Sequence, residues 1–447
     1  MSEGQVRNVS KASDSENILT NSKAFIYGLQ HVFGMCAGIL AVPIMIGNEA
    51  KVTSTEMMIL ISATLFVSGI ATLIQSIGFK EFIGVRMPLM LGASANPTST
   101  MLVIVASTSI GEGKALSIIF TSTIIAGLFC FLIAPVFSKL LKFFPKIVTG
   151  TIITLMGIYL IPIAVRWCAG GVTTAPDYRS VENIILSFIV LLIIVALNKW
   201  GGKTLGSMAI LIGIILGTII SIIIGKFDFT MVNSAGILSI PKPFFFGAPV
   251  FDIPAIVSMI VVMFIMMIAS TGNTVAIHDI FGEDVTEKKV TKALRTDGLS
   301  CMIAGIFNTF PQAPCAQNLG IASMIGIKGT KITIMAGIIL LVLGIIPKFA
   351  AIIASIPYPV LGGAGLVMFG MIISAGINSI KQVEFNGTKN GFIFCVSIAV
   401  AMIPIAVPDF YVNFPQGVIQ TILSSGITSG SICAIVLNLI FNYKDVK

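Results

Sequence analysis

The chain has 447 residues, of which 56% are hydrophobic and only 10% are charged, and its mean hydropathy is +1.02. Soluble globular domains carry about 25% charged residues, so this composition excludes that class and predicts a polytopic membrane protein. The net charge of +8 comes from 27 basic and 19 acidic residues. In a membrane protein Lys and Arg are orientation signals that face anionic lipid, so the excess of basic residues requires no nucleic-acid partner.

Apolar segments separated by short polar breaks follow one another along the chain. We expect a cytoplasmic tail over residues 1–23, seven segments over 24–225, a connecting loop over 226–251, seven segments over 252–441 and a cytoplasmic tail over 442–447. The predicted fold class is an all-α polytopic membrane protein with 14 transmembrane segments of roughly 20 residues each. The segments are 24–47, 55–77, 84–108, 115–136, 147–165, 182–198, 204–225, 252–277, 298–310, 312–327, 332–353, 357–376, 390–407 and 415–441.

The positions of Lys and Arg support this division. With the N-terminus inside, 20 of the 27 basic residues fall in cytoplasmic loops and tails, and 7 fall outside. Such a bias is expected because positive residues near helix ends stay on the cytoplasmic side. We therefore expect a multi-pass protein of the cell inner (plasma) membrane with both termini in the cytoplasm.

Two segments at matching positions of the two halves are interrupted. Residues 87–97 in the third segment read MPLMLGASANP, and residues 310–318 in the tenth read FPQAPCAQN. Such stretches do not form continuous helix, and irregular backbone at membrane depth is tolerated only where it is buried or lines a cavity. Seven segments per half would invert the second half relative to the first, and transporters built from inverted repeats bind their solutes at such interruptions. The pattern predicts a transporter.

Two polar residues in apolar helices are candidates for support or binding. His31 lies early in the first segment. A buried histidine is more often packed and hydrogen-bonded than a ligand, so we expect it to brace the core. Asn273 belongs to the run STGNT over residues 270–274, in the middle of the eighth segment. It either lines a cavity or belongs to a close helix contact made by small residues.

Asp297 is the carboxylate placed well inside the apolar pattern of the second half. Burial favours the protonated form of a carboxyl group, which makes Asp297 a candidate proton carrier or solute anchor. The alternative is a helix N-cap at the membrane edge, because Thr296, Asp297 and Gly298 follow a charged loop.

Gln317 and Asn318 are adjacent carboxamides at the end of the broken tenth segment, with Gly320 following. Each carboxamide offers a carbonyl acceptor and an NH₂ donor, which suits a heterocycle that has both kinds of group along its edge. The alternative is interhelical hydrogen bonding, which is common for Asn and Gln in membranes. Because adjacent side chains diverge, we expect Gln317 to face the solute and Asn318 to brace the backbone.

Several blocks of the chain resemble one known family. Residues 317–326 read QNLGIASMIG, which is similar to the signature of the nucleobase-ascorbate transporter family, also called nucleobase:cation symporter-2, and within it to the bacterial xanthine and uracil permeases. Residues 30–43 (QHVFGMCAGILAVP) resemble the first helix of that family, residues 361–370 (LGGAGLVMFG) its twelfth, and residues 414–426 part of its last. The blocks occur in the family's order.

The resemblance implies two inverted seven-segment repeats, core and gate subdomains, and short antiparallel β-strands in segments 3 and 10. It implies uptake of a nucleobase by movement of the core against the gate, usually with a proton and often in a homodimer. By position, Gln317 would bind the base, Ala316 would offer backbone contacts, and Asn318 and Asp297 would be required supports. Gln rather than Glu at 317 resembles the xanthine and urate branch.

The chain departs from the family pattern at the expected pocket. Ala269 stands where the family has a Glu that hydrogen-bonds the base and takes part in proton coupling, and Asn273 replaces its polar neighbour. Ala95 follows Ser94 where the family commonly has an aromatic residue that covers the base, and Ile325 replaces the signature Thr. These changes imply a larger and less charged pocket, and they leave both proton and sodium open as the coupling ion.

The function predicted from the sequence is secondary active uptake of a purine nucleobase, xanthine or urate, coupled to a proton and driven by alternating access of the core against the gate. The alternative within transport is a permease for uracil or another nucleobase, uncoupled or sodium-coupled. A different class is an anion transporter or channel of the sulfate-permease architecture. The sequence contains no metal-ligand cluster, nucleophile triad or phosphate loop, so we expect no enzyme activity, no metal and no cofactor.

Overall fold

The computed structural model describes residues 20–107, 114–139, 145–173, 175–207, 209–236, 238–381, 383–386, 388–414, 418–424 and 426–442. Of the two expected tails, 1–23 and 442–447, all but residues 20–23 and residue 442 lie outside this part of the chain.

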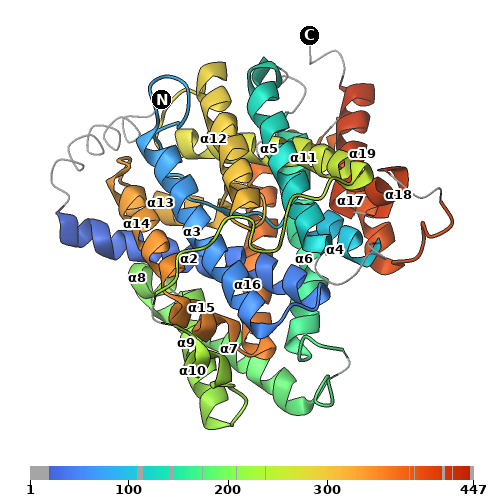
Figure 1. Ribbon diagram of the computed structural model, residues 1–447. Helices are drawn as coiled ribbons and strands as arrows, with labels where there is room; N and C mark the ends of the chain where they lie inside the picture. Colours follow the sequence, from blue (N-terminus) through green and yellow to red (C-terminus); the bar gives the residue numbers. More distant parts are fainter. Residues whose placement is uncertain are drawn as a thin grey trace.

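The described chain is mainly helical (Figure 1). The first half contains α2 (Asn21–Glu49), α3 (Ser54–Ile77), α4 (Thr98–Ser107), α5 (Lys114–Phe137), α6 (Lys146–Cys168), α7 (Val181–Trp200), α8 (Gly202–Ser207), α9 (Ala209–Ile223) and α10 (Thr230–Ser234). The second half contains α11 (Ile253–Ile280), α12 (Glu287–Ile306), α13 (Ala316–Ile325), α14 (Lys331–Ile345), α15 (Pro347–Ala354), α16 (Tyr358–Ile380), α17 (Asn390–Ala406), α18 (Val418–Ser424) and α19 (Gly426–Phe441).

Seven described helices are long and apolar enough to cross a membrane: α2, α3, α5, α6, α7, α11 and α16. Shorter apolar stretches lie in α9, α14, α17 and α19. Exposed apolar side chains on α7, such as Val181, Phe188 and Leu192, are suited to contact lipid. The chain is therefore a multi-pass membrane protein, while the count of fourteen segments stays a prediction.

The helices pack in two groups. In one group α3 packs on α14, and α5 packs on α12 and α11. In the other, α6 packs on α16, α7 packs on α9 and α16, and α17 and α19 pack on each other and on α6. Each group contains helices from both halves of the chain, so segments far apart in sequence lie side by side. The inverted repeat itself stays a prediction.

Glycines allow the closest of these helix contacts. A Cβ atom added at Gly298 of α12 would lie 2.6 Å from the backbone nitrogen of Phe131 and 2.7 Å from the carbonyl oxygen of Gly127, both on α5. Apolar helices in membranes associate mainly through close packing, for which small residues are enriched at contacts. The α5–α12 contact thus fixes the position of α12 and of the residues next to Gly298.

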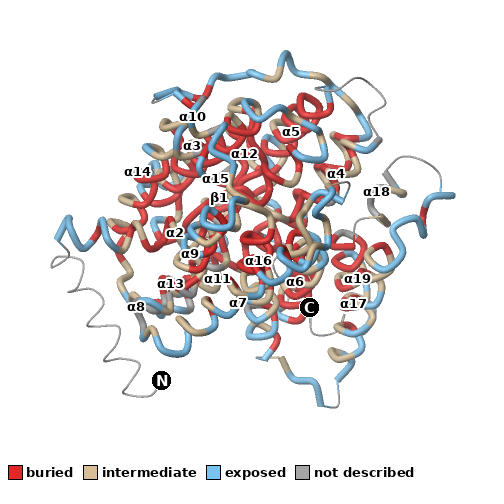
Figure 2. The backbone as a smooth tube through the Cα atoms, turned by 90° about the horizontal axis from the view of Figure 1, so that it is seen from below, coloured by how far each residue is buried: buried red, intermediate tan, exposed pale blue. Residues whose placement is uncertain are grey.

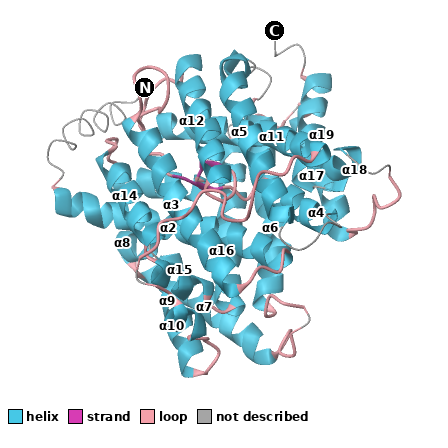
Figure 3. Ribbon diagram, in the orientation of Figure 1, coloured by secondary structure: helices cyan, strands magenta, loops and turns pink. Residues whose placement is uncertain are grey.

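Two short strands lie in the middle of the helices (Figure 3). β1 (Leu91–Ala93) pairs antiparallel with β2 (Gln312–Pro314), with Gly92 opposite Ala313. The chain continues from β1 towards α4 and from β2 directly towards α13, so each interrupted segment consists of a strand followed by a short helix.

Polar side chains of α3 satisfy the irregular backbone around the strands. The Leu91 N–H donates to Thr72 Oγ1 over 3.0 Å, and Ser68 Oγ donates to Gln312 Oε1 over 3.1 Å. Gln312 Nε2 in turn donates to the carbonyl of Phe310 over 2.9 Å. Non-helical backbone at membrane depth needs such internal partners, because lipid supplies none.

The apolar core surrounds the strands and extends through α2, α5, α11 and α12, where Figure 2 shows buried residues concentrated. Glu283, in the loop between α11 and α12, forms an ion-pair cluster with Lys289 of α12 and with Lys328 of the segment between α13 and α14, which we call the Glu283 cluster. Lys289 Nζ donates to Glu283 Oε2 over 2.7 Å, and Lys328 Nζ pairs with Oε1. The hydrogen bonds from Lys289 and then from Lys328 lower the pKa of Glu283 to about 2.

Candidate functional site

A cavity of about 80 Å³ lies where the two strands meet α11 and the pair α6 and α16. It brings together five residues predicted from the sequence: Ser94, Ala95, Ala269, Asn273 and Ala316. The remaining lining residues are Gly38, Ile39, Gly92, Ala93, Asn96, Leu160, Ser270, Ala313, Pro314, Cys315, Phe369 and Ile372. One wall therefore comes from the strands, α2 and α11, and the opposite wall is the apolar surface of α6 and α16.

A hydrogen bond between α11 and β2 shapes the polar wall. Asn273 Nδ2 donates to the carbonyl of Pro314 over 3.1 Å, which ties the middle of α11 to β2. The carbonyl of Pro314 is a buried backbone acceptor at the end of β2, and the side-chain amide of Asn273 satisfies it. Asn273 thus lines the cavity and also ties α11 to β2.

The backbone after β1 forms another part of the wall. The Ser94 N–H donates to the carbonyl of Pro311 over 2.8 Å, and the Asn96 N–H donates to Ser94 Oγ over 3.3 Å. Asn96 is buried, and its Oδ1 has no hydrogen-bond partner among the described residues. A buried amide oxygen without a partner is an acceptor available to a solute in the cavity.

The described cavity lining contains no charged side chain. It lies beside the first residue of α13, Ala316, and close in sequence to the start of α4 at Thr98. The first N–H groups of a helix lack intrahelical acceptors and carry partial positive charge. The site can therefore present N–H donors to carbonyl oxygens and an amide oxygen to N–H groups without a formal charge.

Asp297 lies outside the cavity lining but next to it. It is buried well inside α12, which begins after the N-cap Thr286, so the alternative of Asp297 as an N-cap is wrong. The helix extends further towards the N-terminus than hydropathy indicated, because its first turns carry charged residues that cap and solvate it. Ser270 Oγ donates to Asp297 Oδ2, whereas Oδ1 has no partner among the described residues.

His31 and Asn318 contact each other outside the cavity lining. Asn318 Nδ2 donates to the carbonyl of His31 over 3.2 Å and lies 3.3 Å from its Nδ1, and both side chains are buried. This contact ties α13 to α2. The side chain of Gln317 and the surroundings of Gly320 lie outside the described part of the structure, although both residues belong to α13.

The sequence missed several residues of the cavity. Asn96 was part of the interrupted third segment and Ser270 began the run STGNT, so both had a polar signal in an apolar segment. Leu160, Phe369 and Ile372 had none, because an apolar residue that faces a cavity looks like one that faces lipid. Among the described residues no group of three or more His, Cys, Asp or Glu side chains is arranged to hold a metal ion.

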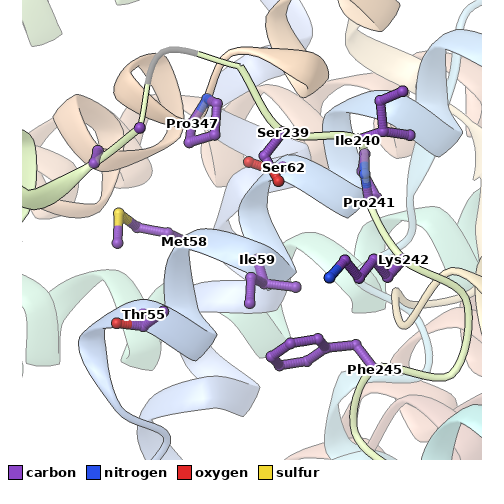
Figure 4. Close-up of a pocket in the computed structure, with 12 residues that line it drawn as sticks. Thr55, Met58, Ile59, Ser62, Ser239, Ile240, Pro241, Lys242, Phe245 and Pro347 are labelled. Atoms are coloured by element: carbon purple, nitrogen blue, oxygen red, sulfur yellow. The ribbon is translucent and has the colours of Figure 1, made fainter.

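A larger pocket of about 400 Å³ lies at the start of α3 (Figure 4). Lys242 and Phe245 of the loop before α11 extend towards Ile59 of α3, and Ser62 and Ser239 lie at another side. None of the residues predicted from the sequence lines it. It is not formed at the interrupted segments, so the smaller cavity is the candidate site.

Comparison with known proteins adds relatives over almost the whole chain. Residues 22–410 match the model Xan_ur_permease, described as a permease family. The uric acid permease PucJ of Bacillus subtilis (strain 168) is 38% identical over 95% of this chain and 94% of its own. The uric acid transporter UacT of Escherichia coli (strain K12) is 36% identical over 96% and 88%, and the xanthine permease of Bacillus subtilis (strain 168) is 36% identical over 94% and 94%.

Solved structures share the fold. The transmembrane domain of the cyanobacterial bicarbonate transporter BicA superimposes with a TM-score of 0.61 at 18% identity, covering 93% of this chain and 98% of that domain. The murine anion transporter Slc26a9 in its inward-facing state gives 0.59 at 12% identity, covering 93% and 68%. At these identities the likeness shows the fold alone.

Proposed function

Because the chain belongs to the nucleobase-ascorbate transporter family, we propose that it is a secondary active transporter that takes up a purine nucleobase, xanthine or urate, together with a proton. The membership itself makes it a nucleobase transporter. The proposal adds the purine, the proton and the mechanism.

The observation that carries the proposal is the uncharged cavity with neighbouring donors and acceptors. A purine dione or trione alternates carbonyl oxygens and N–H groups around a flat ring. Asn96 Oδ1 can accept from a ring N–H, and the first N–H groups of α13 can donate to a carbonyl oxygen. Phe369 supplies an apolar surface on the opposite wall. Gln317 on α13 is the residue that we expect to bind the edge of the base.

Movement of one helix group against the other would open the site. The cavity lies between the group containing α3, α5, α11 and α12 and the pair α6 and α16. Its volume of about 80 Å³ admits a few water molecules, whereas small-molecule pockets usually measure about 300 Å³ or more. A purine would therefore enter only when α6 and α16 move away from the strands, as alternating access requires.

The relatives favour one functional class over the others. PucJ and UacT are named as urate transporters and share 38% and 36% of their residues with this chain, whereas the anion transporters share its fold at 18% identity or less. A purine permease is therefore favoured over an anion transporter or channel, and over a uracil permease. We propose that the protein acts as a homodimer in the cell inner membrane, with cytoplasmic termini, and catalyses no reaction.

Uptake by cells that lack their own purine permeases tests the proposal. Cells expressing this chain should accumulate radiolabelled xanthine or urate, unlabelled guanine, hypoxanthine and uracil being added in turn as competitors. Saturable purine uptake that a protonophore abolishes supports proton symport. Uptake that depends on sodium, or that uracil inhibits better than either purine, would contradict the assignment.

A further inference from the structure

Ser270 joins the cavity to a buried acid. Ser270 lines the cavity, and its hydroxyl donates a hydrogen bond to Asp297 Oδ2. Among the residues that the structure describes, no other side chain both lines the cavity and is hydrogen-bonded to Asp297. Ser270 is thus a bridge of one hydroxyl between the solute site and the carboxyl group.

A void beside Asp297 offers water no room to make the same connection. There the carboxyl group borders a small void lined by Cys130, Met263, Met266, Met267, Gln312 and Ala313. The void does not admit a water-sized sphere, and five of its six other lining residues have sulfur-containing or apolar side chains without oxygen. Ala313 separates this void from the cavity, because it lines both. The hydroxyl of Ser270 is therefore the polar route from Asp297 to the cavity.

The titratable groups close to Asp297 are thiols, which are much weaker acids than its carboxyl group. The titratable neighbours are the thiols of Cys130 on α5 and Cys301 on α12. Arg295 places its guanidinium 4.0 Å from the ring centre of Phe82, and Lys292 pairs with Glu81. The other charged or titratable residues on the described helices packed against α12 lie towards helix ends: Lys114 on α5, Glu56 on α3, and His278 and Asp279 on α11.

We propose that Ser270 relays the coupling proton between Asp297 and the solute cavity, an inference that rests on the proposed proton symport. When Asp297 is protonated, its O–H bond breaks as the proton passes to Ser270 Oγ. The original hydroxyl proton of Ser270 leaves at the same time for an acceptor in the cavity, a water molecule or a ring nitrogen of the solute. One proton is transferred and the serine ends unchanged. The reverse sequence loads Asp297.

The test compares proton-driven accumulation with exchange in proteoliposomes that contain the purified full-length protein. Radiolabelled urate or xanthine is accumulated against an imposed pH gradient, and exchange of labelled for unlabelled purine is measured at equal pH on both sides. The variants are S270A, the hydroxyl-retaining S270T, and S258A as a control. Ser258 is also buried on α11, but its hydroxyl donates to the Pro254 carbonyl of its own helix.

We expect S270A to lower the ratio of accumulation to exchange by about tenfold or more, as loss of a proton-transfer group does. S270T and S258A should keep the ratio of the unmodified protein. A ratio in S270A equal to that of the unmodified protein overturns the proposal, and so does an equal loss of accumulation and exchange, which a binding or folding role would cause. Purine exchange absent from the unmodified protein would instead contradict the proposed function.

Discussion

Gly298 is the position where a single added methyl group should disturb the site from a distance. Its Cβ in G298A would lie 2.6 Å from the Phe131 nitrogen and 2.7 Å from the Gly127 carbonyl oxygen. Both are backbone atoms of α5, so no side chain can turn away and the two helices must separate. Overpacking of this kind costs about 1–3 kcal/mol. The shift would also move Asp297, the preceding residue, relative to Ser270.

Gly370 on α16 provides the matched control, because a Cβ there meets nothing within 4 Å. Ala is better than Gly inside a helix by about 0.5–1 kcal/mol, so G370A should be neutral or slightly stabilising. In a thermal-shift assay in detergent, G298A should melt a few degrees below the unmodified protein, since domains of 150–250 residues shift about 2–4 °C per kcal/mol. Equal melting temperatures for G298A and the unmodified protein, or an equal loss in G370A, would refute the close α5–α12 contact.

Three further predictions concern the cavity and the loop beside α11. N273A should raise the KM of uptake about two- to tenfold, because a hydrogen bond to Pro314 worth about 0.5–1.5 kcal/mol is lost. The control N198A removes a hydrogen bond from a side-chain amide to a backbone carbonyl within α7, and it should leave the KM unchanged. A269M should abolish uptake by filling the cavity without lowering protein yield, and normal uptake would contradict the site. The lowered pKa of Glu283 stabilises the fold above pH 4.5 and stops doing so as the pH falls towards 2, so melting temperatures of E283Q should fall less over that range.

Hydropathy, together with the prolines and polar residues that interrupt helices, predicted the positions of individual segments. The first segment, expected over 24–47, is α2 over Asn21–Glu49, and the polar break before the second is the capped start of α3. The start of α12 was placed too late, because Glu287 to Arg295 lower the hydropathy of turns that are nevertheless helical. Hydropathy does not detect the end of a helix where that end consists of polar residues outside the membrane.

The candidate site was accessible to sequence reasoning only in part. Prolines and small residues located the interruptions at 87–97 and 310–318, and the polar residues Asn273 and Ser94 of the cavity wall stood out in apolar segments. The hydrogen bond between Ser270 and Asp297 joins α11 to α12 and depends on how those helices pack. Contacts of this kind produce no recognisable residue spacing in the sequence, since their two residues belong to different segments.

Transport of a purine by the purified protein is the measurement that tests the central claim most directly. Proteoliposomes containing the unmodified chain should accumulate radiolabelled xanthine or urate in response to an inward proton gradient, and proteoliposomes containing A269M should not. Sulfate and bicarbonate should neither be accumulated nor compete. Accumulation of either anion without any purine uptake would contradict the account.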